Sequence, residues 1–569
     1  MSVPLDTPLS RPAGFRGEFR DDIDARAAYS EAAGIGQIIP RAVAAPVDAD
    51  DVVTLVQWAR EQELSLVPRG SGSSMGGGAI GPGVIVDLSS MNSIEQVDVA
   101  RKHVRVGPGA LRDAVNAAAA KEGLRFPVDP SSGAFCTIGG MVATNAAGAH
   151  SLHFGSIRPW VQSLELVLSD GSRVRVSRGS SLPWDVPVLD RFDCDVRPRI
   201  LTARDHLAAA HDGVRKDSSG YALRAYAESG ELIDLIVGSE GTLAIIVGVE
   251  LELTDLPKAT SGVLGAFRSL DHAVLAAAKA RESGAVACEL LDRTFLDVAA
   301  RGLAGSDETA FPEMISALKF LPRRTEAVLL AEVEGESETV VANLANALSR
   351  AFTESGATTV SVALTPGEQH EIWELRHAAS PILSTLGPAL KSMQFIEDGA
   401  VPPARLADYV RGVRAALDSR YVRGVIFGHA GDAHVHVNPL IDVSKDDWRD
   451  RVQGLLDDIV SLTKRLGGTL SGEHGDGRLR APLLAETWPR EEIDLFVLLK
   501  SAFDPDGILN PGVKVPLAGQ RAIADVKYDP KLPPVPPAAR AALDFVATER
   551  AYATSRLSLI DSHLNSLSP

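Results

Sequence analysis

The sequence is poor in cysteine, with only Cys136, Cys194 and Cys288 among 569 residues. These residues stand far apart and form no CxxC pair. A disulfide framework is therefore excluded, and so is an iron–sulfur cluster, which needs clustered cysteine ligands. We expect reduced thiols and a cytoplasmic protein.

Long hydrophobic runs are absent as well. No segment approaches eighteen consecutive apolar residues, and the N-terminus has no apolar central stretch, so the sequence predicts neither a membrane span nor a signal peptide. The formal net charge is -17, and such a surface repels phosphate backbones, which disfavours nucleic-acid binding. An acidic protein that binds an anionic substrate needs local cationic groups in its pocket.

Length and composition favour several ordinary globular domains, because 45% of the residues are hydrophobic and 23% are charged. Short strand-like runs alternate with Ala-rich helical ones as far as Leu253, and helices on an antiparallel sheet are expected after Pro257. The fold class is therefore α+β. A proline-rich linker, KLPPVPPAARA, precedes a helical tail from about Ala538 to Leu564. We divide the chain into residues 1–30, 31–256, 257–500, 501–518 and 519–569.

A glycine-rich segment, LVPRGSGSSMGGGAIGPGVIVDLS, lies early in the second of these divisions. Glycines let backbone amides approach a pyrophosphate closely, so a phosphate cradle is plausible. A Rossmann fingerprint would open a helix, whereas here the chain runs through Gly81-Pro82-Gly83 into another strand. The segment is not a P-loop either, because no Gly-Lys-Ser/Thr follows its glycines. Taken alone, the segment is equally compatible with a structural turn.

Two further small-residue segments favour a cofactor site. One is VDPSSGAFCTIGGMVATNAAGAHSLHFG, and the other, GSEGT at 238–242, lies between two strand-like runs. With the glycine-rich segment they resemble the vanillyl-alcohol oxidase type of FAD-binding domain. Within that superfamily the chain is similar to the D-lactate, D-2-hydroxyglutarate and glycolate dehydrogenases, whose end marker matches AFDPDGILNPG at 502–512.

This resemblance implies a two-subdomain FAD-binding domain at 31–256, a cap domain for substrate and metal at 257–500, and a return of the chain to the flavin at 501–518. Several relatives attach FAD through a loop histidine, but Ser73 occupies the corresponding position here, so we predict noncovalent FAD. The residues that it implies for FAD binding are Pro68, Arg69, Gly70, Ser71, Gly72, Ser73, Ser74, Gly76, Gly77, Thr137, Gly139, Gly140, Asn145, Gly148, Glu240, Gly241, Thr242 and Asn510.

Histidines cluster in two short stretches, FGHAGDAHVHVNPL and LSGEHGDGRL, although the chain has only 13 in all. Strand alternation places His434, His436 and Asn438 on one face, and the preceding loop could bring His429 alongside. With Glu473 these side chains form a ligand set suited to zinc, manganese or iron. The alternative is that each histidine is a capped loop residue or part of a polar strand face.

The resemblance assigns roles to these residues. It implies that His429, His436 and Glu473 are the metal ligands, with zinc the first choice and manganese or iron the alternatives. It makes His474 the catalytic base. His434 departs from the family, which often has asparagine there, and so it is an extra ligand or a group that supports the ligands.

Substrate recognition needs cations. By the resemblance, Arg376 and Lys391 contact substrate carboxylates, with Ser380 where a threonine is usual, and Asn438 completes the set. An arginine can bind a carboxylate with two parallel hydrogen bonds, whereas a lysine acts as a point charge. The alternative is that both are solvated charges on a helix surface.

The predicted function follows from these sites. A small D-2-hydroxy acid, with 2-hydroxyglutarate and lactate the first choices, would be oxidised to the 2-keto acid by hydride transfer to flavin N5, with assistance from the metal and His474. Electrons would then pass to a separate acceptor: a quinone, a cytochrome, an electron-transfer flavoprotein, an iron–sulfur subunit or oxygen. The tail is a candidate docking or homodimer element. The alternatives are a non-redox FAD transferase resembling alkylglycerone-phosphate synthase and an inactive flavin-binding scaffold.

Overall fold

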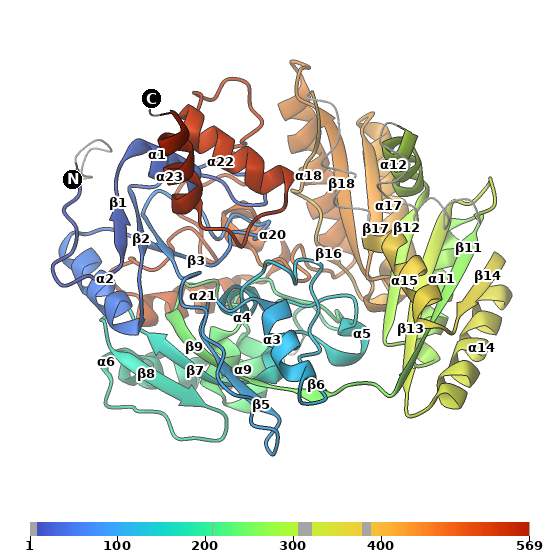
Figure 1. Ribbon diagram of the computed structural model, residues 1–569, viewed down its shortest axis with the longest axis horizontal. Coiled ribbons are helices and arrows are strands. Elements are labelled where there is room, and N and C mark those ends of the chain that lie inside the picture. The colour runs from blue at the N-terminus through green and yellow to red at the C-terminus, as the bar shows by residue number, and fades with distance from the viewer. Residues whose placement is uncertain (1–7, 208, 305–320, 378–388, 568–569) are drawn as a thin grey trace.

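The computed structural model of the protein describes residues 8–207, 209–304, 321–377 and 389–567. It has two parts that lie side by side in Figure 1. The first part contains two four-stranded sheets, and the second is built on one large sheet. Within the described ranges, no helix combines the length and the apolar character that crossing a membrane requires.

The first sheet has the strand order β1-β2-β4-β3, and β4 pairs in parallel with both β2 and β3. Strands covered on both faces need continuous apolar runs, and every residue of β4, sequence VIVD, is buried. Helix α2 (Ala49–Glu61) packs on this sheet, and Asp48 caps its N-terminus. The strands are β1 (Glu18–Arg20), β2 (Ala42–Ala45), β3 (Leu66–Arg69) and β4 (Val84–Asp87).

The second sheet is antiparallel, with the order β5-β9-β7-β8. Its core also includes Phe496, Leu499 and Phe503 of α21 (Arg490–Phe503), so a late helix completes a domain that begins early in the chain. The strands are β5 (His103–Val106), β7 (Val161–Val167), β8 (Arg173–Ser177) and β9 (Ile245–Glu252). Helices on this sheet include α3 (Arg112–Ala120), α4 (Ile138–Thr144), α9 (Leu223–Ser229) and α10 (Leu232–Ile236).

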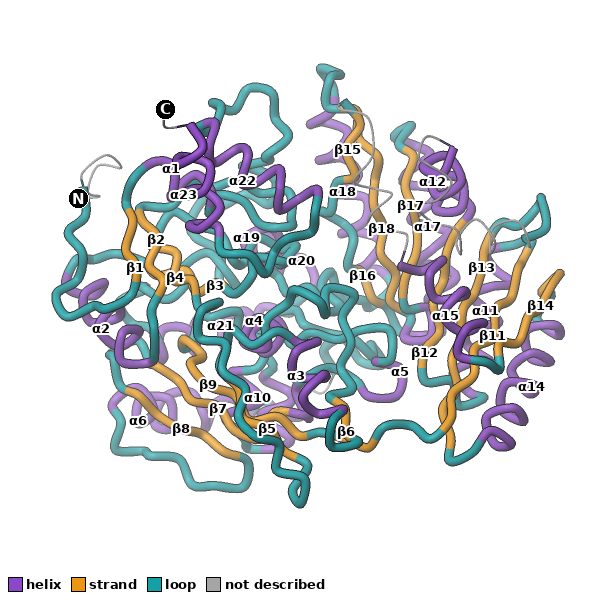
Figure 2. The backbone as a smooth tube through the Cα atoms, viewed as in Figure 1, coloured by secondary structure: helices purple, strands orange, loops and turns teal. Residues whose placement is uncertain are grey.

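The large sheet of the second part is also antiparallel, with the order β14-β11-β13-β12-β17-β18-β15 and with β16 added on β18. Figure 2 shows its strands running as one layer. The strands are β11 (Ala259–Phe267), β12 (Ala287–Asp292), β13 (Ala327–Gly335), β14 (Ala357–Ala363), β15 (Leu390–Ser392), β16 (Gly399–Ala400), β17 (Arg423–Gly428) and β18 (His434–Asp442).

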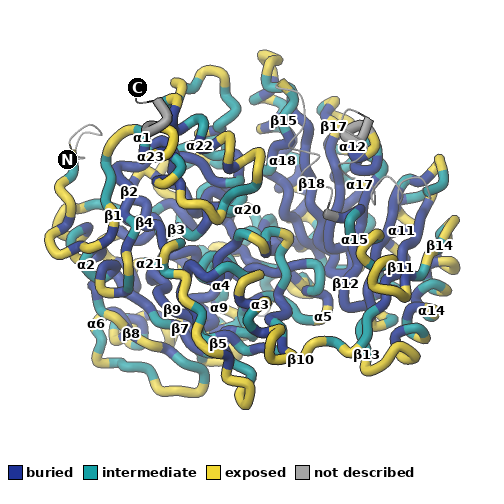
Figure 3. Tube along the Cα trace, viewed as in Figure 1, coloured by how far each residue is buried: buried dark blue, intermediate teal, exposed yellow. Residues whose placement is uncertain are grey.

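Helices cover one face of this sheet fully and the other face in part. The fully covered face packs its apolar residues against α11 (Leu270–Glu282), α14 (Glu338–Glu354), α17 (Leu406–Ser419) and α18 (Trp448–Arg465). The opposite face carries α12 (Arg293–Ala304) and α15 (Pro366–His377). Figure 3 shows the central strands of this sheet as buried, whereas the edge strand β14 is partly exposed.

The two parts meet at the loop between β17 and β18. Asp432 in this loop accepts hydrogen bonds from Ser151 Oγ at 2.7 Å and from Arg215 Nε at 2.9 Å. A second contact joins His150 to Glu332 of β13, with 3.1 Å between Nε2 and the carboxylate. The first part therefore holds the loop that carries His429 and leads into His434 and His436 of β18.

The C-terminal tail, predicted to be helical from about Ala538 to Leu564, consists of two helices. These are α22 (Pro537–Thr548) and α23 (Arg556–Leu567), and both pack on α1 (Ile23–Ala28). Arg550 adopts φ 53° between them, which ends the first helix. No glycine or proline marks this break, so the sequence did not indicate where one helix ends and the next begins.

Candidate functional site: a cofactor cavity beside a histidine cluster

The glycine-rich segment leaves β3 and enters β4 after a tight loop. A Cβ on Gly70 would lie 2.1 Å from Thr137 Oγ1, so no other residue fits there without a shift. Gly72 has φ 76° and lies directly under the Arg69 guanidinium. The glycines therefore let the loop lie against the segment that starts α4.

Arg69 is buried, and although its Nε has no partner among the described residues, both terminal nitrogens of its guanidinium are hydrogen-bonded. It donates to the backbone oxygens of Tyr29, Glu31 and Ala79 at 2.9–3.3 Å. Burial is the main reason that the pKa of Arg69 is lowered to about 9. This side chain holds the loop in place through its terminal nitrogens.

A single cavity of about 1740 Å³ runs between the two parts. Small-molecule sites usually have roughly 300–1,000 Å³, so this one has room for a dinucleotide and a substrate together. Predicted FAD-binding residues that line it are Pro68, Arg69, Gly70, Ser71, Gly72, Ser73, Ser74, Thr137, Gly139, Gly140, Glu240 and Gly241. Those that do not line it are Gly76, Gly77, Asn145, Gly148, Thr242 and Asn510.

Residues of this second set join separate segments behind the cavity wall. Asn510 donates to the backbone oxygens of Gly78 and Glu240, at 3.0 and 2.8 Å. Thr242 Oγ1 lies 2.7 Å from the Tyr221 hydroxyl. Their contacts support the shape of the cavity.

Polar atoms in the described part of the chain fit an oxygen-rich cofactor in this cavity. Ser74 Oγ, on the glycine loop, is buried and has no hydrogen-bond partner among the residues described. A buried polar atom without a partner costs about 1–3 kcal/mol, which a ligand's hydrogen bond would offset. The glycine loop and its neighbour therefore suit the pyrophosphate of a dinucleotide such as FAD.

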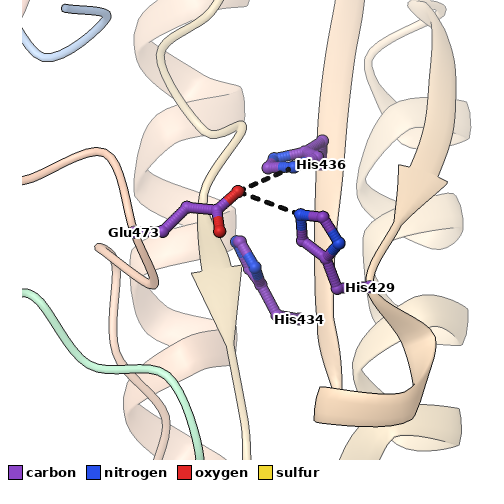
Figure 4. Close-up of side chains that lie close together, drawn as sticks. All are labelled: His429, His434, His436 and Glu473. Carbon is purple, nitrogen blue, oxygen red and sulfur yellow. Dashed lines mark hydrogen bonds and ion pairs between the residues drawn. The ribbon is translucent and has the colours of Figure 1, made fainter. Parts of the chain in front are cut away.

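The clustered histidines meet Glu473 at the far side of the same cavity (Figure 4). Glu473 Oε1 lies 3.0 Å from His429 Nε2 and 3.4 Å from His436 Nε2. Ligand atoms of His429, His434, His436 and Glu473 all lie within 4.8 Å of one another. One imidazole comes from the loop and two from β18, so strand alternation and the loop turn together bring them to one point.

Each imidazole is oriented by a second partner. Glu289 Oε1 lies 2.6 Å from His429 Nδ1, and the Glu397 backbone oxygen lies 3.0 Å from His436 Nδ1. Asp398 lies 2.9 Å from His434 Nε2, while His434 Nδ1 is buried without a partner among the described residues. Such partners fix the ring that a metal would bind. The three imidazoles and the carboxylate suit a divalent cation such as zinc.

The pKa values of these groups are shifted in different directions because their surroundings differ. Burial is the main cause that lowers the pKa of His436 to about 3, which keeps its ring neutral. Burial also acts on His429, but the carboxylates of Glu289 and Glu473 outweigh it and raise the pKa of His429 to about 9. In Glu473, the Lys216 ammonium and His429 overcome burial and lower its pKa.

His474 follows Glu473 and is the most accessible of the group. Its side chain is 23% exposed, against 5% for His429, 0% for His434 and 7% for His436. Its ring stacks on His436 with 5.1 Å between centroids, and Glu397 Oε1 lies 3.2 Å from its Nδ1. Although burial acts against it, Asp398 and Glu397 raise the pKa of His474. Of the four histidines, a molecule in the cavity reaches His474 most easily.

The predicted substrate residues are not all on one face. Arg376, on α15, is buried, donates from Nε to Glu289 at 2.7 Å and lines the cavity. Asn438 lies on the face of His436 and also lines it. Lys391 also lines the cavity, although its pairing with Ile441 places it on the face of the sheet opposite His436; its Nζ lies 5.5 Å from the ring centre of Tyr528, which lines the cavity as well. Ser380 lies outside the described residues.

The sequence did not reveal the residues that link the histidine cluster and Glu473 to neighbouring segments. Lys216 Nζ donates to Glu473 Oε2 at 2.7 Å, across 257 residues of chain. Arg480 pairs with Glu397, and Glu289 links His429 to Arg376. The one available signal was a charged residue inside an apolar strand, as in Glu289 of the run ACELLD.

Two family models match the chain. The model for the FAD binding domain matches residues 40–177, and the model for the C-terminal domain of FAD linked oxidases matches residues 256–513. The glycolate oxidase subunit GlcD of Bacillus subtilis is 30% identical over 499 residues, which cover 87% of this chain and 93% of that protein. The chain belongs to the FAD-linked oxidase family. The predicted resemblance is therefore confirmed.

Some of the other relatives are longer. The D-2-hydroxyglutarate dehydrogenase of Pseudomonas putida is 30% identical over 546 residues, covering 91% of this chain but 52% of that protein. The chain thus spans about half the length of such relatives. A D-lactate dehydrogenase of Archaeoglobus fulgidus is 28% identical over 484 residues, covering 84% of this chain and 92% of that protein.

Solved structures confirm the fold. A 4-ethylphenol oxidase from Gulosibacter chungangensis has a TM-score of 0.64 at 14% identity, covering 87% of this chain and 94% of that one. An alkyldihydroxyacetonephosphate synthase has a TM-score of 0.61 at 17% identity, covering 87% and 83%. The predicted architecture, a two-part FAD-binding domain with a cap domain, is confirmed, while the domain limits stay predictions.

Proposed function

We propose that this chain oxidises a small D-2-hydroxy acid to the 2-keto acid with noncovalently bound FAD and a divalent cation. The observation that carries the proposal is the meeting of three buried imidazoles and Glu473 beside His474, in the same cavity as the glycine loop. Relatives named for D-2-hydroxyglutarate, D-lactate and glycolate support this class of reaction. The first substrates to try are 2-hydroxyglutarate and lactate.

The residues that would hold the cation are His429, His436 and Glu473, with His434 as the fourth group. Zinc is the first choice, because two or three imidazoles and a carboxylate are common zinc ligands. Held there, the cation would polarise the substrate hydroxyl and lower its pKa. FAD, when bound, supplies the acceptor for the hydride that leaves the substrate Cα.

The remaining tasks fall to side chains of this chain. His474 takes the hydroxyl proton, since its ring is the most accessible and is held by Glu397. Arg376 offers its terminal N–H groups to the substrate carboxylate, because Glu289 already holds its Nε. Burial of the whole corner excludes water and strengthens these contacts.

Two further properties belong to the proposal. The flavin dissociates, because Ser73 stands where a histidine attaches FAD in several relatives; acid precipitation should leave a colourless pellet and a yellow supernatant. The electrons leave to a separate acceptor, such as a quinone, a cytochrome, an electron-transfer flavoprotein or an iron–sulfur subunit. The alkyldihydroxyacetonephosphate synthase is only 17% identical to this chain, so the likeness shows a shared fold and not a shared reaction. No observation favours a non-redox transferase.

The test is anaerobic bleaching of the flavin by separate D and L forms of 2-hydroxyglutarate, lactate and malate. Rapid bleaching by a D acid supports the proposal and names the substrate class. Protein stripped of metal by a chelator should keep its FAD and lose bleaching, and added zinc or manganese should restore it. Full bleaching by metal-free protein would remove the cation from the proposal, and no bleaching by any acid would refute the reaction.

A further inference from the structure

The C-terminal tail, residues 519–569, forms part of the wall of the cofactor cavity. The family model ends at residue 513, so the tail lies beyond the matched region. Tail residues reach the cavity from two stretches, one that precedes α22 and one that begins within it. The tail residues at the cavity include Lys527, Tyr528, Arg540, Asp544, Arg550 and Tyr552.

The tail is fixed to the cofactor half of the molecule. The Lys527 amide donates to the Ile35 oxygen at 2.8 Å, and the Gln37 amide donates to the Asp525 oxygen at 2.8 Å. Further along, Arg540 donates to Glu31 at 2.9 Å. These bonds hold the tail against the segment that precedes β2. Its side chains therefore have defined positions at the cavity.

After α22 the tail crosses the loop that contains Phe135. The Tyr552 ring lies 5.2 Å from the Phe135 ring, and the Arg550 guanidinium stands over the same ring at 5.0 Å. All three residues line the cavity. The left-handed backbone at Arg550, φ 53°, is what turns the chain here.

The positive charge of Arg550 is suited to an anionic group of the cofactor. FAD brings a pyrophosphate with two negative charges, and the glycine loop has no lysine or arginine between Arg69 and β4. Arg69 is committed to backbone oxygens, Arg112 pairs with Asp113 at 2.9 Å, and Arg540 pairs with Glu31. Across the described ranges, no carboxylate lies within ion-pair distance of Arg550. Of the other described tail cations that line the cavity, Lys527 donates from Nζ to the Ala32 oxygen at 3.2 Å and Arg540 pairs with Glu31, so the charge of Arg550 is the one left without a partner.

We propose that the tail completes the FAD site, with Arg550, supported by Tyr552 and Phe135, forming an ion pair with the pyrophosphate of bound FAD. The proposal rests on the FAD binding that the family implies, and it is independent of which hydroxy acid is oxidised. It assigns to the tail a cofactor-binding role in place of a docking role.

The test measures the dissociation constant of FAD for the flavin-stripped full chain, by the quenching of FAD fluorescence at low and at high salt. Arg550→Gln should weaken binding by about tenfold to a hundredfold, the range for a hydrogen bond to a charged group. Arg550→Lys should recover most of the affinity. Arg521→Gln is the matched control, because Arg521 is exposed on the same tail and does not line the cavity.

Salt separates an ion pair from a structural role. Wild-type affinity should fall with salt, and the fall should be smaller in Arg550→Gln. Equal affinity in wild type and Arg550→Gln overturns the proposal, and so does a loss that Arg550→Lys fails to recover. If Arg550→Gln does not fold, a wild-type affinity that salt leaves unchanged overturns it. Failure of the wild type to bind FAD would instead refute the proposed function.

Discussion

The glycine loop and the histidine corner, which consists of His429, His434, His436, Glu473 and His474, form two sides of one cavity. The two sides are built from different kinds of groups. The loop presents backbone and small side chains, and the fit of Gly70 against Thr137 depends on an absent Cβ. The corner presents long polar side chains, and each of its imidazoles is held by a second group such as Glu289 or Asp398. The first side is sensitive to added atoms, and the second is sensitive to lost partners.

The largest effect is expected at His474, which should act in the chemistry and not in cofactor binding. His474→Ala should lower the rate constant of flavin reduction by about a hundredfold to ten-thousandfold, the usual contribution of a positioned base. FAD should stay bound, because the glycine loop lies across the cavity. Anaerobic stopped-flow measurement of flavin absorbance checks both. The exposed His370→Ala is the control, and an unchanged rate in His474→Ala would remove the base from the mechanism.

The next largest effect is expected at a residue that touches neither substrate nor cofactor. Glu289→Gln keeps the size of the side chain but removes the charge that orients His429 Nδ1. Partners of this kind usually contribute about tenfold to a hundredfold in metal affinity. Metal titration followed by competition with a chromogenic chelator measures the change. The exposed Glu228→Gln is the control, and equal affinities would show that the second partners do not tune this corner.

On the glycine-loop side of the cavity, one added methyl group should be enough to weaken FAD binding. Gly70→Ala places Cβ 2.1 Å from Thr137 Oγ1, and relief of such crowding costs about 1–3 kcal/mol. FAD affinity should fall by about tenfold, while zinc affinity stays as in the wild type. Gly367→Ala is the matched control, since nothing lies within 4 Å of the added atom there. Loss of zinc binding in Gly70→Ala would mean that the two sides are not independent.

The smallest effect concerns two buried carboxylates of one strand, β12. Although burial acts to raise it, His429 and Arg376 lower the pKa of Glu289, whereas burial raises the pKa of Asp292 to about 7. The unfolded chain loses the Asp292 proton near pH 3.8, so wild-type stability falls as pH rises from about 4 to about 7. Asp292→Asn removes this titration and should therefore gain about 1–3 kcal/mol relative to wild type at pH 8 but not at about pH 4.

Melting curves at several pH values check this expectation. Asp292 also accepts a hydrogen bond from the Phe295 amide at 2.8 Å, and asparagine can keep that bond. The exposed Asp446→Asn serves as the control. A gain for Asp292→Asn that is equal at low and high pH would show that ionisation of this carboxyl is not what costs stability.

Much of the fold could be predicted from local patterns. Alternation in AHVHVNP indicates β18, and the Ala-rich periodicity of residues 270–282 indicates α11. Both follow from the side-chain repeat of a strand or helix, which neighbours in sequence already display. The break between α22 and α23 was missed because Arg550 turns the chain without a glycine.

The sequence by itself determined the elements, the small-residue loop and the clustering of His429, His434, His436 and Glu473. Only the tertiary structure decided what stands behind them. Lys216 reaches Glu473 across 257 residues, and the register of β15 puts Lys391 on the face opposite His436. Local periodicity fixes which way a side chain points along its own element. Contacts between distant segments depend on how whole elements pack, and no short stretch of sequence carries that information.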